Sequence, residues 1–286
     1  MTFPKSTWRL LKTKAAPGPW NMAVDEAILE AVSGQNSLPT LRFYSWEPAC
    51  LSLGYAQALD EVDQEALAQN GWDVVRRPTG GRAILHTDEL TYSVIGLPDD
   101  PRLEGGVLES YQRLSKALLL GLQRLSLPAQ INEKKKKEEQ SEVEPICFEV
   151  PSNYEITVDG KKLIGSAQAR KKGGVLQHGT VPLYGDLTRI TQALRFDNEE
   201  KRERVGQRLL SRATTVEEVV KRVVSWEEAA GAFGAAFEEE LSFEWEQGEL
   251  SASERERAEE LVETKYGAEE WTARVSSRSR MARMNE

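Results

Sequence analysis

The chain has 286 residues and a mass of 32.1 kDa, which suits one large domain or two small ones. Its 37 Lys and Arg against 46 Asp and Glu give a formal net charge of −9. This balance argues against general nucleic-acid binding, which needs a cationic face, although a local basic patch is still allowed. The two cysteines, Cys50 and Cys147, cannot build a disulfide framework and have no CxxC metal-ligand spacing.

The amino-terminal residues MTFPKSTWRL contain no apolar segment of the kind that a secretory signal needs. The longest aliphatic stretch, around residues 117–122, is far too short to span a bilayer. We therefore expect a protein of the reducing cytoplasm.

The first part of the chain alternates strands and helices. A strand is expected at 8–12, then a helix capped by Asn21 and stopped by Gly34. The pattern next predicts strands at 40–46 and 50–55, a short helix at 60–70, and two strands, WDVVRR and LTYSVIGL, on either side of a Pro-Thr-Gly-Gly turn.

A longer helix is expected at about 108–125, followed by the charged segment 132–144. That segment contains no surface to bury, so a solvated loop is the simplest interpretation, and a lid or partner-docking loop is the alternative. Asp159–Gly160 predicts a tight hairpin because this pair supplies the positive φ angles of a type I′ turn. A further strand, GVLQHGTVPL, follows Gly173–Gly174.

From about residue 186 the chain is expected to be mainly helical. Thr215 with Glu218 and Ser225 with Glu228 fit the capping box. The tail 272–286 has no apolar face and is expected to be disordered. The predicted fold is α+β, with mixed sheets flanked by helices, and the carboxyl-terminal helices either complete the same core or form a small cap.

The first motif that could carry chemistry is RRPTGGRAILH, which runs into LTYS. Its Gly-Gly pair permits positive φ or close approach of the backbone to a ligand. Arg76, Arg77 and Arg82 around a glycine turn suit an anion. The alternative is a plain turn with solvated arginines, and the spacing does not match a Walker A loop.

The second motif is KKLIGSAQ, followed by QHGT. A lysine at the start of a strand is usually solvated, but Lys162 adjoins an apolar, small-residue strand where its ammonium group could be partly desolvated. A metal site built from His86, His178 and Cys147 is not expected because the spacing is wrong. A serine hydrolase is not expected either, because the chain has no GxSxG elbow.

The two cysteines differ in their surroundings. Cys50 lies in the apolar strand ACLSLGY and fits a structural role, which is the common one for buried cysteines. Cys147 follows the charged loop and a proline, outside any periodic pattern. A loop cysteine held by a rigid scaffold is the better candidate for a nucleophile.

Together these segments resemble the lipoate–protein ligase and octanoyltransferase superfamily, from about Trp8 to Leu183. RRPTGGRAILHTDELTYS is similar to its ligand-binding RR-x-x-GG segment. DGKKLIGSAQAR with GVLQHGT is similar to the segment that carries its essential lysine. The resemblance implies a single catalytic domain over 1–271, related to biotin ligase catalytic domains, and substrate-binding residues Arg77, Gly80, Gly81, Arg82, His86, Ser93, Gly165, Ser166, Ala167, His178 and Gly179.

Within that superfamily, the run CFEVPS resembles the cysteine loop of one octanoyltransferase type. By this resemblance Cys147 is the acyl-thioester nucleophile and Lys162 lowers the pKa of its thiol. The implied reaction moves octanoyl from an acyl carrier protein to a lysine of a lipoyl domain, such as the glycine cleavage system H protein. It requires no metal or cofactor. The Lys- and Glu-rich loop before Cys147 departs from the family pattern and bears on carrier recognition.

The acceptor lysine must lose a proton to react, because the pKa of its amine is near 10.4 in water. The candidates for this step are Lys162 and the two histidines. The oxyanion could be held by backbone amides near Gly165–Ser166 or near Gly80–Gly81. The sequence leaves both choices open.

Three other functions fit parts of the same pattern. An ATP-dependent lipoate–protein ligase would use Lys162 and the glycine turn without needing Cys147, but such ligases usually carry an accessory domain. An amidotransferase between lipoyl domains would also use a cysteine. A non-catalytic carrier-binding or lipoate-sensing protein would keep the pocket alone. Candidate docking patches for acidic carriers are 170–172, 134–137 and the Arg-rich tail.

Overall fold

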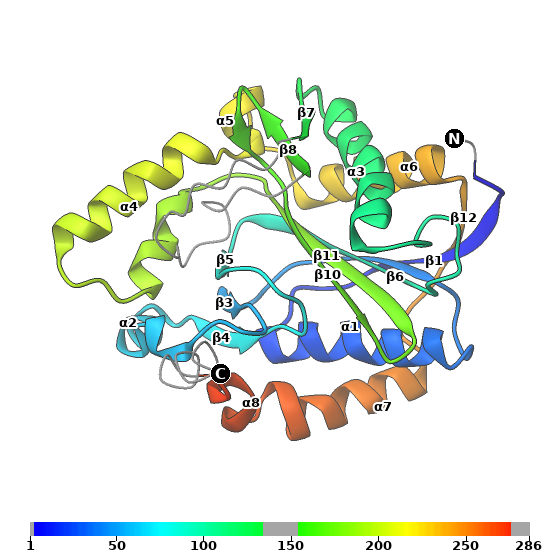
Figure 1. Ribbon diagram of the computed structural model, residues 1–286, viewed down its shortest axis with the longest axis horizontal. Coiled ribbons are helices and arrows are strands. Elements are labelled where there is room, and N and C mark those ends of the chain that lie inside the picture. The colour runs from blue at the N-terminus through cyan, green and yellow to red at the C-terminus, as the bar shows by residue number, and fades with distance from the viewer. Residues whose placement is uncertain (1–2, 134–153, 276–286) are drawn as a thin grey trace.

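The computed structural model describes residues 3–133 and 154–275. Its centre is a six-stranded sheet with strand order β10-β11-β6-β2-β1-β12 (Figure 1). Strand β1 pairs in parallel with β2 and β12, and the other neighbours are antiparallel. The strands are β1 (Ser6–Lys12), β2 (Thr40–Tyr44), β6 (Glu89–Gly96), β10 (Gly165–Lys171), β11 (Gly174–Pro182) and β12 (Phe243–Gln247). The mixed sheet between helices confirms the predicted α+β class.

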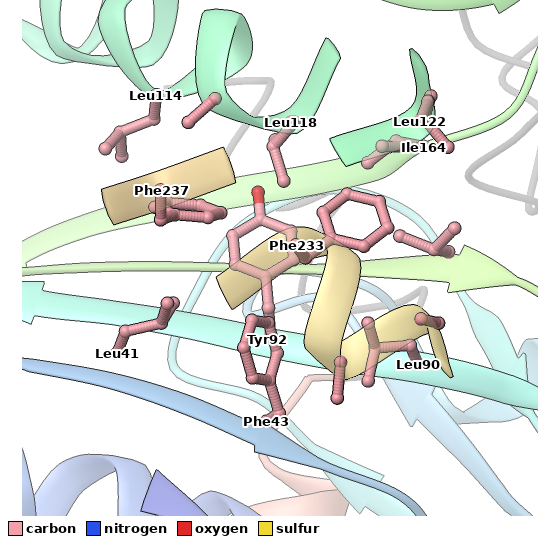
Figure 2. Packing of buried hydrophobic residues seen from close by; sticks show 14 of the residues in the cluster. Leu41, Phe43, Leu90, Tyr92, Leu114, Leu118, Leu122, Ile164, Phe233 and Phe237 are labelled. Atoms are coloured by element: carbon pink, nitrogen blue, oxygen red, sulfur yellow. The ribbon is translucent and has the colours of Figure 1, made fainter. Parts of the chain in front are cut away.

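Helices cover both faces of this sheet (Figure 1). On one face lie α3 (Val107–Arg124) and α6 (Trp226–Leu241), and on the other α1 (Gly18–Ser33) and α7 (Ala252–Leu261). Between α3, α6 and the sheet, Tyr92 packs with Phe233 and Phe237 in the largest apolar cluster (Figure 2). Every residue of β6 is buried because helices pack on both of its faces.

Two small sheets adjoin the main one. The first has the order β4-β3-β5 and is packed by α2 (Gln64–Asn70), η3 (Leu187–Ala193) and α4 (Glu199–Arg212). Its strands are β3 (Cys50–Leu53), β4 (Asp73–Arg76) and β5 (Ile84–His86). The second joins β7 (Gln130–Glu133), β8 (Tyr154–Val158) and β9 (Lys161–Lys162). The remaining elements are η1 (Leu59–Glu61), α5 (Val216–Val220), η4 (Val262–Tyr266) and α8 (Glu269–Ala273).

Helix α1 begins earlier than its sequence predicts. Pro17 is the residue before the first helical position, and Asn21 lies inside the helix, fully buried. The Asn21 amide donates to the carbonyls of Ala16 and Ser45, so it joins the helix to the strand ending at Tyr44. The predicted Asn21 cap is therefore wrong, because this side chain serves a tertiary contact.

The hairpin and the carboxyl-terminal helices follow the prediction more closely. Asp159 and Gly160 have φ angles of 49° and 77°, as a type I′ turn requires. Thr215 and Ser225 cap their helices by accepting from the backbone amides of Glu218 and Glu228. The second half of each predicted capping box is wrong, because the side chain of Glu218 accepts from Thr214 and that of Glu228 pairs with Arg222. The helices complete the main core, since α6 packs on the sheet, and β12 adds an edge strand that the sequence pattern did not suggest.

Cys147 and most of the charged segment 132–144 lie outside the described residues. Of the predicted tail 272–286, Thr272 and Ala273 belong to α8 and residues 274–275 follow it, whereas 276–286 lie outside the described residues. Within the described part of the chain, no helix is both long enough and apolar enough to cross a membrane.

Candidate active site

One pocket gathers side chains from the main sheet, the small β4-β3-β5 sheet and α1. Together with its open mouth it spans about 420 Å³. Its lining is mostly apolar, with a few polar groups. The lining residues are Met22, Tyr44, Trp46, Ser52, Arg77, Gly81, Ile84, His86, Thr91, Gly165, Ser166, Ala167, His178, Gly179 and Thr180.

The two paired arginines of the RR-x-x-GG segment donate hydrogen bonds to backbone carbonyls. Arg77 donates to the carbonyls of Ser52, Gly80 and Arg82. Arg76 is fully buried and donates to the carbonyls of Gly54, Gln57 and Thr272. The expectation that Arg76 and Arg77 present an anion site is wrong, because their guanidinium groups are directed at backbone carbonyls.

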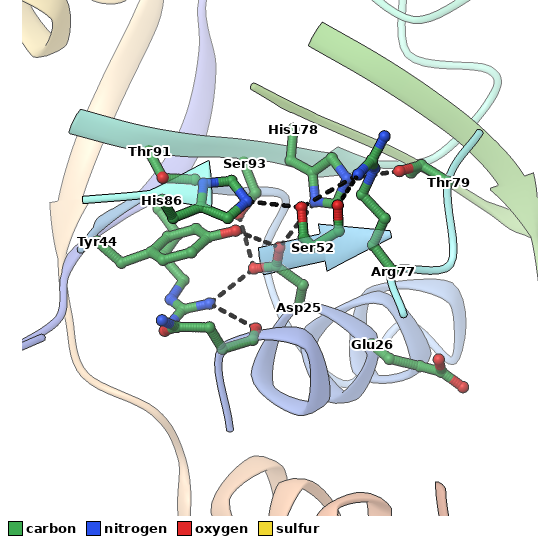
Figure 3. A network of polar contacts seen from close by, with 12 residues as sticks. Asp25, Glu26, Tyr44, Ser52, Arg77, Thr79, His86, Thr91, Ser93 and His178 are labelled. Atoms are coloured by element: carbon green, nitrogen blue, oxygen red, sulfur yellow. Dashed lines mark hydrogen bonds and ion pairs between the residues drawn. The ribbon is translucent and has the colours of Figure 1, made fainter. Parts of the chain in front are cut away.

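His86 forms part of a buried polar chain (Figure 3). Its Nε2 lies 2.7 Å from Ser52 Oγ, and its Nδ1 lies 2.6 Å from Glu89 Oε1. The imidazole stacks on Trp46 with ring centroids 4.0 Å apart and an interplanar angle of 10°. Although burial opposes its charge, the neighbouring His86 helps to hold the pKa of Glu89 below its usual range, so this carboxyl group stays ionised.

His178 lies in a second network on the same pocket (Figure 3). Its Nε2 is 2.6 Å from Thr79 Oγ1, and its Nδ1 is 3.4 Å from Asp25 Oδ2. Asp25 also accepts from Arg42, Tyr44 and Ser93. Burial lowers the pKa of His178, which favours the neutral imidazole at pH 7.

Lys162 is buried on β9, and its Nζ lies 3.4 Å from Glu155 Oε1. The backbone carbonyl of Lys162 accepts from the amide of Thr214. Gly165, three residues further along, lines the pocket. Cys50 lies elsewhere, fully buried in β3, and burial raises the pKa of its thiol well above the ordinary value. A buried, protonated thiol fits the structural role predicted for Cys50.

The structure brings most of the predicted substrate-binding residues to the pocket, but not all. Three of them do not line it: Gly80 is exposed on the turn, Arg82 is half-buried beside it, and Ser93 is buried behind the pocket, where it donates to Asp25. Those that line it are Arg77, Gly81, His86, Gly165, Ser166, Ala167, His178 and Gly179.

Sequence reasoning missed the acidic partners of the histidines and part of the pocket wall. Asp25 is a charged residue on the buried side of α1, a placement that its apolar neighbours Val24, Ala27 and Ile28 could have revealed. Ser52 in β3 and Trp46 just after β2 had no such signal, because only the tertiary structure decides which of their neighbours face the pocket.

Comparison with known proteins identifies the family. The family described as lipoyl protein ligase A/B catalytic domain matches residues 17–238. The chain is 43% identical to octanoyltransferase LipM of Carboxydothermus hydrogenoformans, over 94% of this chain and 99% of the relative. It is 39% identical to octanoyltransferase LipM of Bacillus subtilis, over 93% of this chain and 98% of that relative.

Solved structures agree on the fold. The bipartite lipoate protein ligase of Thermoplasma acidophilum has a TM-score of 0.77 and 26% identity, covering 93% of this chain and 96% of that one. Lipoate-protein ligase A bound with ATP has a TM-score of 0.76 and 27% identity, covering 94% and 99%. The chain belongs to the lipoyl protein ligase A/B catalytic-domain family, and within it to the octanoyltransferases of lipoate biosynthesis.

Proposed function

We propose that the pocket holds an octanoyl chain while Cys147 carries it as a thioester, from octanoyl-acyl carrier protein to a lysine of a lipoyl domain, such as the glycine cleavage system H protein. The observation that carries this proposal is the mostly apolar pocket beside the lysine segment. Burying an alkyl chain in such a pocket contributes about 0.8 kcal/mol per methylene. The small residues Gly165, Ala167 and Gly179 leave room for it.

Lys162 is proposed to activate the nucleophile. Strand β8 begins seven residues after Cys147 and pairs with Lys162 through Thr157. A positively charged Lys162 near the Cys147 thiol would stabilise the thiolate by charge attraction. Its burial strengthens that attraction, because fewer water molecules screen a charge inside the protein.

The reaction proceeds in two exchanges. The Cys147 thiolate attacks the carrier thioester, forms the acyl–sulfur bond and releases the carrier thiol. The amine of the acceptor lysine then attacks the Cys147 thioester, the carbon–sulfur bond breaks, and an amide forms. Amide formation from a thioester is downhill, so the transfer needs no ATP. Two further functions used in this family, ATP-dependent ligation and transfer between lipoyl domains, are alternatives to this course.

Intact-protein mass spectrometry tests the proposal. Wild type mixed with octanoyl-acyl carrier protein, without ATP, should gain one octanoyl group and lose it when apo H protein is added. Cys147→Ala should gain none, whereas Cys50→Ala should behave as wild type. Acceptor modification that depends on ATP and free octanoate would instead identify a ligase. Octanoylation from an octanoylated lipoyl domain, but not from the acyl carrier, would identify the amidotransferase.

A further inference from the structure

A hydrogen-bonded chain leads from the pocket wall toward the outside of the molecule. Ser52 Oγ lies in the pocket, His86 follows at 2.7 Å, and Glu89 follows at 2.6 Å. Glu89 also borders an outer groove that includes Lys14, Asp88 and Trp226. The three residues therefore connect two separate cavities across a buried stretch of protein.

The charge of Glu89 decides which atoms are the donors in the hydrogen bonds between Ser52, His86 and Glu89. An ionised Glu89 can only accept, so Nδ1 of His86 carries a proton and donates it to the carboxylate. In the neutral ring Nε2 is then an acceptor, and the Ser52 hydroxyl donates to it. Arg77 Nη1, 3.1 Å away, occupies one lone pair of Ser52 Oγ. A hydroxyl has two lone pairs, so a second one is available in the pocket.

From this geometry we propose that Ser52, His86 and Glu89 form a proton relay that accepts the proton lost by the acceptor lysine as it attacks the thioester. The inference rests on the proposed function and names the groups that serve its second exchange. Ser52 would be the residue that touches the attacking nitrogen, and His86 and Glu89 would act through it.

The neutral amine nitrogen bonds to the thioester carbon, and the carbon–sulfur electron pair leaves on Cys147 as a thiolate. The nitrogen gives one proton to Ser52 Oγ, which passes its own proton to His86 Nε2. The resulting imidazolium is stabilised by the Glu89 carboxylate, and its proton then reaches water in the outer groove. Imidazole is the side chain that enzymes use most often for such proton transfers.

His178 and Lys162 are poorer candidates on the same criteria. Nδ1 of His178 is 3.4 Å from Asp25, and that carboxylate is already paired with Arg42 at 2.8 Å. Nε2 of His178 faces Thr79, which does not line the pocket. Lys162 pairs with Glu155, and its proposed role requires it to stay charged. His86 alone of the three joins a pocket hydroxyl to a carboxylate at short range.

The test is the discharge of enzyme preloaded with octanoyl on Cys147, using two amines. Discharge by the lysine of apo H protein should slow about 10²-fold in Ser52→Ala and His86→Ala. Discharge by hydroxylamine should change little, because this weak base is neutral at pH 7 and gives up its proton readily to water. Glu89→Gln should lie between, since it keeps a hydrogen-bond acceptor but loses the charge that stabilises the imidazolium.

Ser115→Ala is the matched control, since Ser115 is a buried serine on α3 whose hydroxyl has no hydrogen bond among the described residues. Octanoyl-loaded Ser115→Ala should be discharged by both amines at the wild-type rates. If Ser52→Ala slows discharge by both amines equally, or slows discharge by neither, the relay is overturned while the thioester mechanism stands. If wild type never acquires octanoyl on Cys147, the proposed function fails and the relay falls with it.

Discussion

Asp25 on α1 and Arg42 on β2 form a salt bridge of 2.8 Å in which both side chains are completely buried. The guanidinium of Arg42 also donates to the backbone carbonyl and the side-chain oxygen of Asn21. Although burial favours the neutral acid, Arg42 and His178 hold the pKa of Asp25 below its usual range. The pair therefore ties the helix behind the pocket to the central sheet and gives His178 a fixed partner.

We expect Asp25→Asn to destabilise the protein strongly, because it leaves Arg42 as an uncompensated buried charge. Losing one partner of a buried pair typically costs about 3–5 kcal/mol. Urea denaturation of the variant measures this cost. Glu244→Gln is the control, since its pair with Lys5 is exposed and solvent-exposed ion pairs contribute little to stability. Similar effects of the two substitutions would contradict the interpretation.

Gly54 lets the end of β3 pack against the glycine turn of the pocket. A Cβ built at Gly54 would lie 2.0 Å from the carbonyl oxygen of Gly81. Because Gly81 lines the pocket, Gly54→Ala should displace the wall, and displacements of about 1 Å can cost about 10²-fold in rate. Steady-state octanoyl transfer measures this loss.

The control for this prediction is Gly231→Ala on α6, where an added Cβ meets no atom within 4 Å. Alanine in a helix interior is favoured over glycine by up to about 1 kcal/mol, so this variant should keep its activity and melt at the same or a higher temperature. Normal transfer by Gly54→Ala would show that the close approach to Gly81 has no importance for the pocket.

The two cysteines should react very differently with a thiol reagent. Cys50 is fully buried, and burial raises the pKa of its thiol, so in native wild type at neutral pH we expect iodoacetamide to modify Cys147 alone. Cys147→Ala should take up no label until it is unfolded. Peptide mass spectrometry locates the modified residue. Rapid labelling of Cys50 in the native protein would contradict the assignment of the two thiols.

The same reagent tests Lys162. If its charge stabilises the Cys147 thiolate, Lys162→Met should raise the apparent pKa of that thiol toward the free value of about 8.5. The rate of alkylation followed against pH gives this pKa. Lys161→Met, on the neighbouring and more exposed residue, is the control and should leave the profile unchanged. An unshifted profile in Lys162→Met would remove the proposed activating role.

Glu26 gives the fold a dependence on acid. It pairs with Lys172 at 2.8 Å and Lys265 at 2.5 Å and accepts from Tyr266. Although burial acts in the opposite direction, these partners lower its pKa from 4.5 to about 2. The folded-state pKa is depressed, so the stabilisation is present above about pH 5 and is lost as pH falls toward 2. Its size is about 3 kcal/mol.

We therefore expect Glu26→Gln to lower the free energy of unfolding at pH 7 and to reduce its slope between pH 5 and 2. Urea denaturation across this range checks both. Glu270→Gln, at an exposed glutamate four residues after Tyr266, should change neither. A variant with the full acid sensitivity of wild type would mean that other carboxyl groups, such as Glu30, carry the effect.

The sequence by itself determined the features that are local. The type I′ hairpin at Asp159–Gly160, the helix at α3 and the caps at Thr215 and Ser225 depend on neighbouring residues, so their patterns were sufficient. The motifs around Arg77, His86, Gly165 and His178 also identified most of one pocket wall. The same motifs, by resemblance, indicated the family.

Only the tertiary structure decided the remaining features, because they join segments that are distant along the chain. Strand β12 pairs with β1 across more than two hundred residues. Its short sequence FEWEQ, with mostly exposed side chains, does not indicate which distant strand it pairs with. Arg76 and Arg77 turned inward to backbone carbonyls of loops that the sequence could not place beside them. The hydrogen bond between Ser52 and His86 forms because β3 and β5 pair side by side in the small sheet, and the sequence does not show that pairing.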